Sequence, residues 1–184
     1  MANLTLYSVT AMVMLDADGH RLLAKYYSRP PLHTSKYPTL KEQKALEKQL
    51  HSKMKRGGNE VMLLDGHLVL ARSLSDVHFY LVGSIDENEV LLNTALKGFI
   101  DTVSALLKHQ VDKQSLIDGL DLVVLALDEC IDDGIVAEID PEVMVNRVSK
   151  RGNDSVDMSV ALNEQTLLQA YQQVKERFAS HLLQ

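Results

Sequence analysis

The chain has 184 residues, 46% of them hydrophobic and 24% charged, with a formal net charge of −6 and a single cysteine, Cys130. This length and composition fit one globular domain with a substantial core and exclude a disordered or fibrous protein. The acidic balance argues against nucleic-acid binding, and one cysteine excludes both an intramolecular disulfide and a cysteine-based metal site.

The hydrophobic segments are too short to span a membrane. The most apolar stretch, "LVVLAL", is bracketed by Asp121 and Asp128, and the apolar run at residues 9–15 has no basic leader. We therefore expect a cytosolic protein whose contact with any membrane comes through a partner.

The first third of the chain predicts a hairpin followed by a helix. Residues 6–15 and 20–27 are extended in character, and the turn signal "DADG" separates them. After a proline-bearing loop, residues 39–54 have helical periodicity, and Thr39 and Glu42 have the spacing of a capping box. The apolar face of this helix carries Leu46, Leu50 and Met54.

The middle of the chain predicts three more strands and then helices. Residues 60–65, 68–74 and 77–85 are short apolar runs separated by turn signals. Helical periodicity then begins at Glu87, and the apolar positions of this long helix are Leu92, Leu96, Phe99, Val103 and Leu106. A second helical stripe extends over residues 116–131, with Leu116, Leu120, Val123, Val124, Leu127 and Ile131 on its apolar side.

The last third predicts a short helix, a linker and a separate helix. Asp140 and Pro141 have the types expected at a helix N-cap and first position. Residues 150–163 lack either periodicity and are interpreted as a mobile linker. Residues 164–184 carry a narrow apolar stripe that predicts an amphipathic helix. The domain itself is expected to span residues 1–149.

This order of elements predicts an α+β fold. Five strands joined mainly by tight turns form a largely antiparallel sheet. Because the strands are apolar at most positions, both faces of the sheet must be covered. We expect the helix after the second strand on one face and the later helices on the other.

The stretch "MVMLDADGH" raises the hypothesis of a phosphatase of the haloacid dehalogenase type, in which Asp16 would be the nucleophile. Such a nucleophile follows a parallel strand and precedes a loop and helix, whereas "HRLLAKYY" follows here directly as a strand. We therefore interpret Asp16 and Asp18 as residues that hydrogen-bond a turn. A magnesium-dependent phosphatase remains the enzymatic alternative.

Other candidate sites are weak. Residues 118–142 hold nine carboxylates and no lysine or arginine, but Asp133 stands where a calcium-binding EF-hand loop needs glycine. Asp132 and Asp133 are interpreted as a helix end. The seven histidines lack zinc spacing. Lys53, Lys55 and Arg56 could contact acidic lipid head groups, but three charges beside a turn are interpreted as solvated. We expect no catalytic residue, no metal and no cofactor.

Several long sequence segments, in the same order along the chain, resemble those of one family, and together they span almost the whole chain. They are "LYSVTAMVMLDADGHRLLAKYY", "PTLKEQKALEKQL", "DVHFYLVGSIDENEVLL" and "LDECIDDGIVAEIDPEVMVNRV". In these segments the chain resembles the zeta subunits of the coatomer, which are small longin-type chains related to the sigma chains of clathrin adaptors. The resemblance implies a longin-like fold.

The resemblance also implies a function. It implies a non-enzymatic subunit of the COPI coat that binds the trunk of the coatomer gamma chain and joins the remaining coatomer subunits. An Arf-type GTPase would recruit the coat to the cytosolic face of Golgi membranes for Golgi-to-ER and intra-Golgi transport. The alternative within the same fold is a longin-type trafficking regulator that binds a SNARE or a small GTPase.

The expected contact with the gamma chain lies in residues 132–138. Here apolar side chains stand beside exposed acids just after a helix end, as suits an interface with a polar rim. The other interpretation is that the apolar side chains complete the domain's own core. The candidate residues are Asp132, Asp133, Ile135, Val136 and Glu138. No cargo-binding residue is assigned.

Overall fold

The computed structural model describes residues 6–28, 37–55 and 60–160, with side chains as far as residue 150. The chain divides into two compact units, Met1–Asn146 and Arg147–Gln184. The sheet, its covering helices and the candidate site all belong to the first unit. Within the described residues, no helix is both long enough and apolar enough to cross a membrane.

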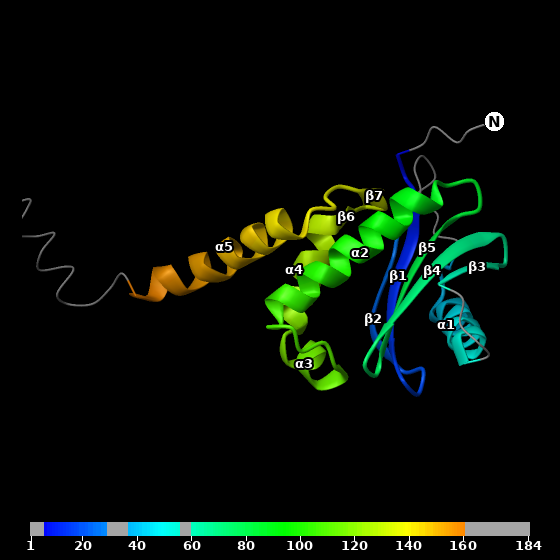
Figure 1. Cartoon of the computed structure of the whole chain (residues 1–184), viewed down its shortest axis with the longest axis horizontal. Helices are drawn as coiled ribbons and strands as arrows, with labels where there is room; N and C mark the ends of the chain where they lie inside the picture. The colour runs from blue at the N-terminus through cyan, green and yellow to red at the C-terminus, as the bar shows by residue number, and fades with distance from the viewer. Residues whose placement is uncertain (1–5, 29–36, 56–59, 161–184) are drawn as a thin grey trace, which may run out of the picture. The chain divides into compact units, whose positions relative to one another are not determined.

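A five-stranded sheet forms the centre of the first unit (Figure 1). Its strands lie in the order β2-β1-β5-β4-β3, and each neighbouring pair is antiparallel. Val13 of β1 pairs with Ala24 of β2 and with Tyr80 of β5. The predicted hairpin and the predicted antiparallel sheet are therefore confirmed. The strands are β1 Val9–Asp16, β2 Arg21–Tyr26, β3 Val61–Leu64, β4 His67–Leu74 and β5 Val77–Ser84.

Helix α1, Leu40–Lys55, covers one face of the sheet. The predicted capping box is present: the backbone N–H of Thr39 donates to the Glu42 carboxylate at 3.0 Å, and the N–H of Glu42 donates to the Thr39 hydroxyl at 3.3 Å. Leu46 and Leu50 are buried against the alternate residues of β1 and β5 that point to this face. The helix starts where the sequence predicts.

The opposite face of the sheet is covered by α2, Glu89–Leu106, with α4 packed against α2 (Figure 1). Asn88 caps α2, since its side-chain oxygen accepts from the N–H of Val90 at 2.9 Å. Phe79 of β5 meets Phe99 of α2 edge to face, with ring centroids 6.4 Å apart. The prediction of helices on both faces is confirmed.

The prediction of one continuous helix over residues 116–131 is wrong, because the helix is interrupted and ends before Ile131. Two helices, α3 Lys113–Asp118 and α4 Leu120–Cys130, meet at Gly119. A Cβ at this position would lie 2.5 Å from Leu107 Cδ2, so glycine leaves room for the leucine side chain at the C-cap of α2.

The chain after α4 forms a short hairpin in place of further helix. It consists of β6, Ile131–Asp132, and β7, Ile135–Val136. Asp133 and Gly134 make the turn, with φ of 44° and 87°. The interpretation of Asp132 and Asp133 as a helix end is therefore wrong: Asp132 lies in a strand and Asp133 in a turn.

Helix α5, Pro141–Val160, begins as predicted but runs further. The Asp140 carboxylate accepts from the N–H of Glu142 at 2.9 Å and so caps the helix. Residues 150–160 are helical although the sequence predicts a linker there, and they contain no proline, which would interrupt a helix. The predicted helix over 164–184 lies outside the described residues, and the division of the chain at residue 149 stays a prediction.

Candidate functional site

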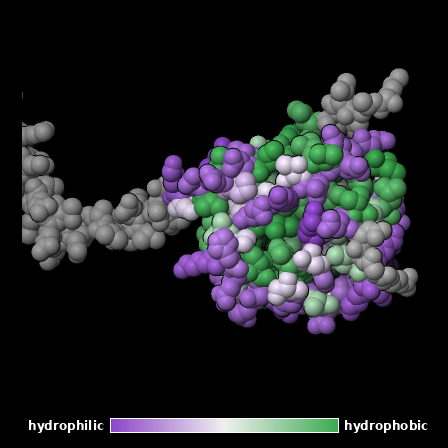
Figure 2. All heavy atoms as spheres, in the orientation of Figure 1, coloured by the Kyte–Doolittle hydropathy of each residue, from purple (hydrophilic) through white to green (hydrophobic). Residues whose placement is uncertain are grey.

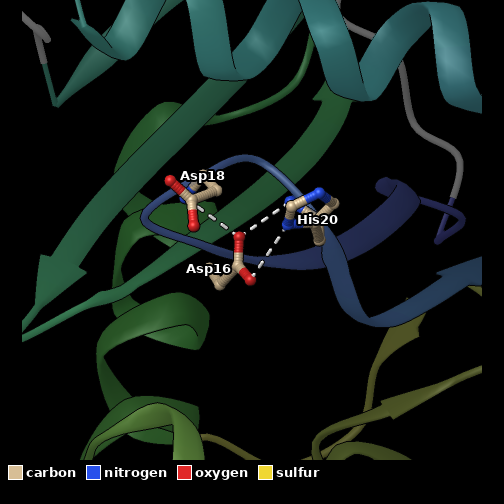
Figure 3. Close-up of side chains that lie close together, drawn as sticks. All are labelled: Asp16, Asp18 and His20. Atoms are coloured by element: carbon tan, nitrogen blue, oxygen red, sulfur yellow. Dashed lines mark hydrogen bonds and ion pairs between the residues drawn. The ribbon is translucent and has the colours of Figure 1, made fainter.

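The turn that first suggested an enzyme is a tight hairpin connection between β1 and β2. Asp16 ends β1 and is buried, and one of its carboxylate oxygens accepts from the N–H groups of Asp18 at 3.0 Å and His20 at 2.8 Å. Figure 3 shows the carboxylate turned inward under the loop. Asp18 supplies its backbone N–H, while its own side chain is exposed and bonds no described residue. The predicted turn role is confirmed for Asp16 and not for the Asp18 side chain.

A lysine from a distant helix neutralises Asp16. The Lys113 ammonium at the start of α3 lies 2.8 Å from the second carboxylate oxygen, and His20 Nδ1 lies 3.3 Å from the same oxygen. Burial alone would raise the pKa of Asp16, but the bonds from Lys113, His20 and Asp18 outweigh it and hold that pKa well below its ordinary value. Asp16 is therefore ionised, and both of its carboxylate oxygens are engaged in the bonds that hold the turn.

Asp16, Asp18 and His20 are also the one group of three potential metal ligands among the described residues, with ligand atoms within 4.8 Å of one another. The Lys113 ammonium already holds the place beside Asp16 that a cation would take. The same arrangement does not suit a phosphatase, because the carboxylate faces a lysine and two backbone N–H groups instead of an open strand end. The geometry gives this turn a structural role.

The predicted contact residues come together on the β6–β7 hairpin and the segment that follows it. Asp132 and Asp133 are exposed, whereas Ile135 and Val136 are partly buried. The Glu138 carboxylate accepts from the N–H of Ile139 at 3.0 Å and of Asp140 at 3.2 Å, so it orders the chain before α5. The apolar pair is thus shared between the domain's own packing and the surface.

Two glycines fix this hairpin to the sheet and to α2. The N–H of Val9 donates to the Gly134 carbonyl at 2.9 Å, and a Cβ on Gly134 would lie 2.8 Å from the Val9 carbonyl oxygen. On the other side, a Cβ on Gly98 of α2 would clash with the carbonyl oxygen of Ile139, which lies just after the hairpin. Neither close approach tolerates a side chain, so the hairpin is held closely against β1 and the segment after it closely against α2.

The acidic side chains around the hairpin help to raise the pKa of a buried tyrosine. Tyr27 follows β2 and is 4% exposed. Burial first, and then the charges of Asp128, Cys130, Asp132 and Asp133, raise the pKa of Tyr27 far above its ordinary value. Asp128 itself is paired with the Lys25 ammonium at 2.6 Å. Asp132 and Asp133 have no ion pair with a described residue, so their charges are available to a partner.

Exposed apolar side chains also lie on α2, α3 and α4. In Figure 2 apolar and polar residues are interspersed over the face that carries α2. The exposed large apolar residues of these helices and of the segment before α5 are Val90, Leu91, Ile117, Leu120, Val124 and Ile139. Large apolar residues scattered in this way are ordinary on a monomer. Ile139 lies in the segment that directly follows the hairpin, beside its unpaired acids in the sequence.

The comparisons with known proteins agree with this architecture. Residues 8–155 match the model of the family described as clathrin adaptor complex small chain, which defines the class of protein. One solved structure, a homology model of the full-length AP-3 complex in a stretched open conformation, superposes with a TM-score of 0.62. It is 13% identical and covers 84% of this chain and 99% of that chain, so it shows the shared fold.

Relatives of higher identity narrow the class. Coatomer subunit zeta-1 of Bos taurus and that of Homo sapiens are each 41% identical over 179 residues, covering 97% of this chain and 95% of theirs. Coatomer subunit zeta of Saccharomyces cerevisiae is 34% identical over 188 residues, covering 100% of this chain and 99% of its own. The chain belongs to the clathrin adaptor small chain family and, within it, to the coatomer zeta subunits.

Proposed function

We propose that this chain is a non-enzymatic small subunit of the COPI coatomer coat. The family supports a structural subunit of a coat, and full-length similarity to coatomer zeta subunits is the observation that carries the finer assignment. The buried, lysine-paired state of Asp16 supports the non-enzymatic role, because the best sequence candidate for a nucleophile is committed to a turn.

In this proposal the chain binds the trunk of the coatomer gamma chain and enters the coat together with the remaining subunits. An Arf-type GTPase then brings the coat to the cytosolic face of Golgi membranes, where it serves Golgi-to-ER and intra-Golgi transport. An exposed acidic hairpin beside apolar side chains is a suitable surface for such a partner.

Affinity capture tests the assignment. The tagged full-length chain, incubated with cytosol of its own source, is expected to retain coatomer subunits in near-stoichiometric amounts, identified by mass spectrometry. Capture of a SNARE or of a small GTPase without coatomer would favour the longin-type regulator instead. Magnesium-dependent phosphatase activity that disappears in Asp16→Asn would revive the enzymatic alternative.

Charge reversal tests the proposed contact. The double variant Asp132→Lys/Asp133→Lys is expected to weaken binding to the gamma trunk at least about tenfold, because both acids are exposed and lack an ion pair within the described chain. The matched control Asp101→Lys/Asp118→Lys makes the same change of charge at exposed acids on α2 and α3. Equal binding by both double variants would count against Asp132 and Asp133.

A further inference from the structure

A basic hollow lies between α1 and the β1–β2 turn, away from the acidic hairpin. Its volume is about 610 Å³. In Figure 3, the ribbon of α1 lies above the turn that carries Asp18 and His20. The hollow is lined by six basic side chains, namely His20, Arg21, Lys44, Lys48, His51 and Lys55.

Helical spacing gathers four of these side chains. Lys44, Lys48, His51 and Lys55 follow one another at intervals of four, three and four residues, which places them on one face of α1. The lysines of this set repel one another at such spacing and so do not stabilise the helix. The stripe therefore has no evident structural benefit.

Few acids oppose these cations. Glu47 lines the hollow, but it is buried, pairs with Arg21 and accepts a hydrogen bond from the Tyr26 hydroxyl at 3.0 Å. Asp18 is the other lining acid and is exposed. The ammonium groups of Lys44, Lys48 and Lys55 have no ion pair within the described chain. Three lysines without an ion pair among the described residues thus line one hollow in a protein whose net charge is −6.

His51 lines the hollow and packs tightly against the β1–β2 turn. A Cβ on Gly19, which has a φ of 87°, would lie 2.7 Å from His51 Cδ2, so the imidazole packs directly on the bare backbone of the turn. Both ring nitrogens of His51 are buried and have no hydrogen-bond partner among the described residues. Buried polar groups are usually paired, and no described residue pairs with the nitrogens of this ring.

We propose that the basic hollow binds a small anion that carries two or more phosphate groups. Its volume falls within the range of about 300–1,000 Å³ typical of small-molecule sites. Lysine ammonium groups bind phosphate as point charges, and several of them are needed to balance adjacent phosphates. This binding site is independent of the proposed gamma-chain contact, which lies on other elements.

Two sources present the same chemistry, a soluble polyphosphate and the head group of a phosphorylated lipid. Isothermal titration of the full-length chain with inositol hexakisphosphate tests the first source. Co-sedimentation with phosphatidylcholine vesicles, with and without phosphatidylinositol bisphosphate, tests the second. Inorganic phosphate is the single-phosphate comparison in both assays.

Saturable binding of either probe is expected, with inorganic phosphate binding at least about a hundredfold more weakly. Lys44→Gln/Lys48→Gln is expected to weaken binding at least about tenfold, whereas Lys41→Gln/Lys97→Gln, which removes two exposed lysines that do not line the hollow, leaves it within about twofold. Binding of the vesicles supports the lipid source, and binding of the soluble probe alone supports the soluble one. No saturable binding, or equal losses in the two double variants, would overturn the proposal.

Discussion

The ion pair between Arg21 and Glu47 is expected to hold α1 on the sheet. Glu47 stands on the buried face of α1, and its side chain is 6% exposed, while that of Arg21 on β2 is 29% exposed. The Arg21 guanidinium also lies over the Tyr26 ring, 5.9 Å from the centroid. Replacing Glu47 alone leaves a partly buried guanidinium without its carboxylate.

The burial of this ion pair sets how much free energy of unfolding each variant is expected to lose. Breaking a buried pair by removing one partner costs about 3–5 kcal/mol, and the partial exposure of Arg21 places Glu47→Met near the lower end, about 3 kcal/mol. Replacing both residues by methionine is expected to cost only about 1 kcal/mol, since no charge is then left buried. The Tyr26 hydroxyl keeps an acceptor in that variant, because the Gln43 carbonyl lies 3.4 Å away.

Urea denaturation of the wild type, Arg21→Met, Glu47→Met and the double variant measures this coupling. We expect the cost of the double variant to be at least about 2 kcal/mol smaller than the summed costs of the single variants. Costs that add within about 0.5 kcal/mol would show that the pair does not act as a unit and would refute the reasoning.

Three further predictions use the same denaturation assay or a thiol assay. Gly98→Ala is expected to destabilise the chain by about 1–3 kcal/mol despite the better helix propensity of alanine, because its Cβ meets the Ile139 carbonyl; an unchanged urea midpoint would contradict this. The depressed pKa of Asp16 means that its contribution is present above the ordinary carboxylate pKa of about 3.9 and is lost as the pH falls toward the folded-state value. Stability of the wild type should therefore decline more steeply below about pH 5 than that of Asp16→Asn, and parallel pH profiles would argue against the ion pair. Burial, followed by the charge of Glu138, raises the pKa of Cys130 to about 12, so native protein at pH 8 should react with a disulfide reagent at least about a hundredfold more slowly than protein in urea, and similar rates would contradict that burial.

Local patterns in the sequence were sufficient for most of the fold. Strand periodicity and turn signals predicted the five antiparallel strands, and Thr39 with Glu42 predicted the start of α1. These features depend on residues close together in the chain. The hairpin at residues 131–136 also had such a signal, since the turn pair Asp133-Gly134 is followed directly by the apolar residues Ile135 and Val136, but the helical stripe before it concealed the change of period.

The remaining features depend on contacts between distant residues. Lys113 reaches Asp16 across 97 positions in the sequence, and nothing near either residue indicates the pair. Gly98 appears in sequence as an isolated weak point of a helix, while its reason is the approach of the Ile139 backbone. Likewise, helical spacing alone shows that Lys44 and Lys48 share a face, but only the packed turn shows that this face borders a hollow.

The most direct test of the proposed function is a binding measurement with purified components. The full-length chain and the trunk of the coatomer gamma chain are mixed at micromolar concentration and separated by size exclusion. We predict that they elute together as a one-to-one complex, ahead of either component alone. Separate elution at the positions of the free proteins would contradict the assignment of this chain as the coatomer small subunit.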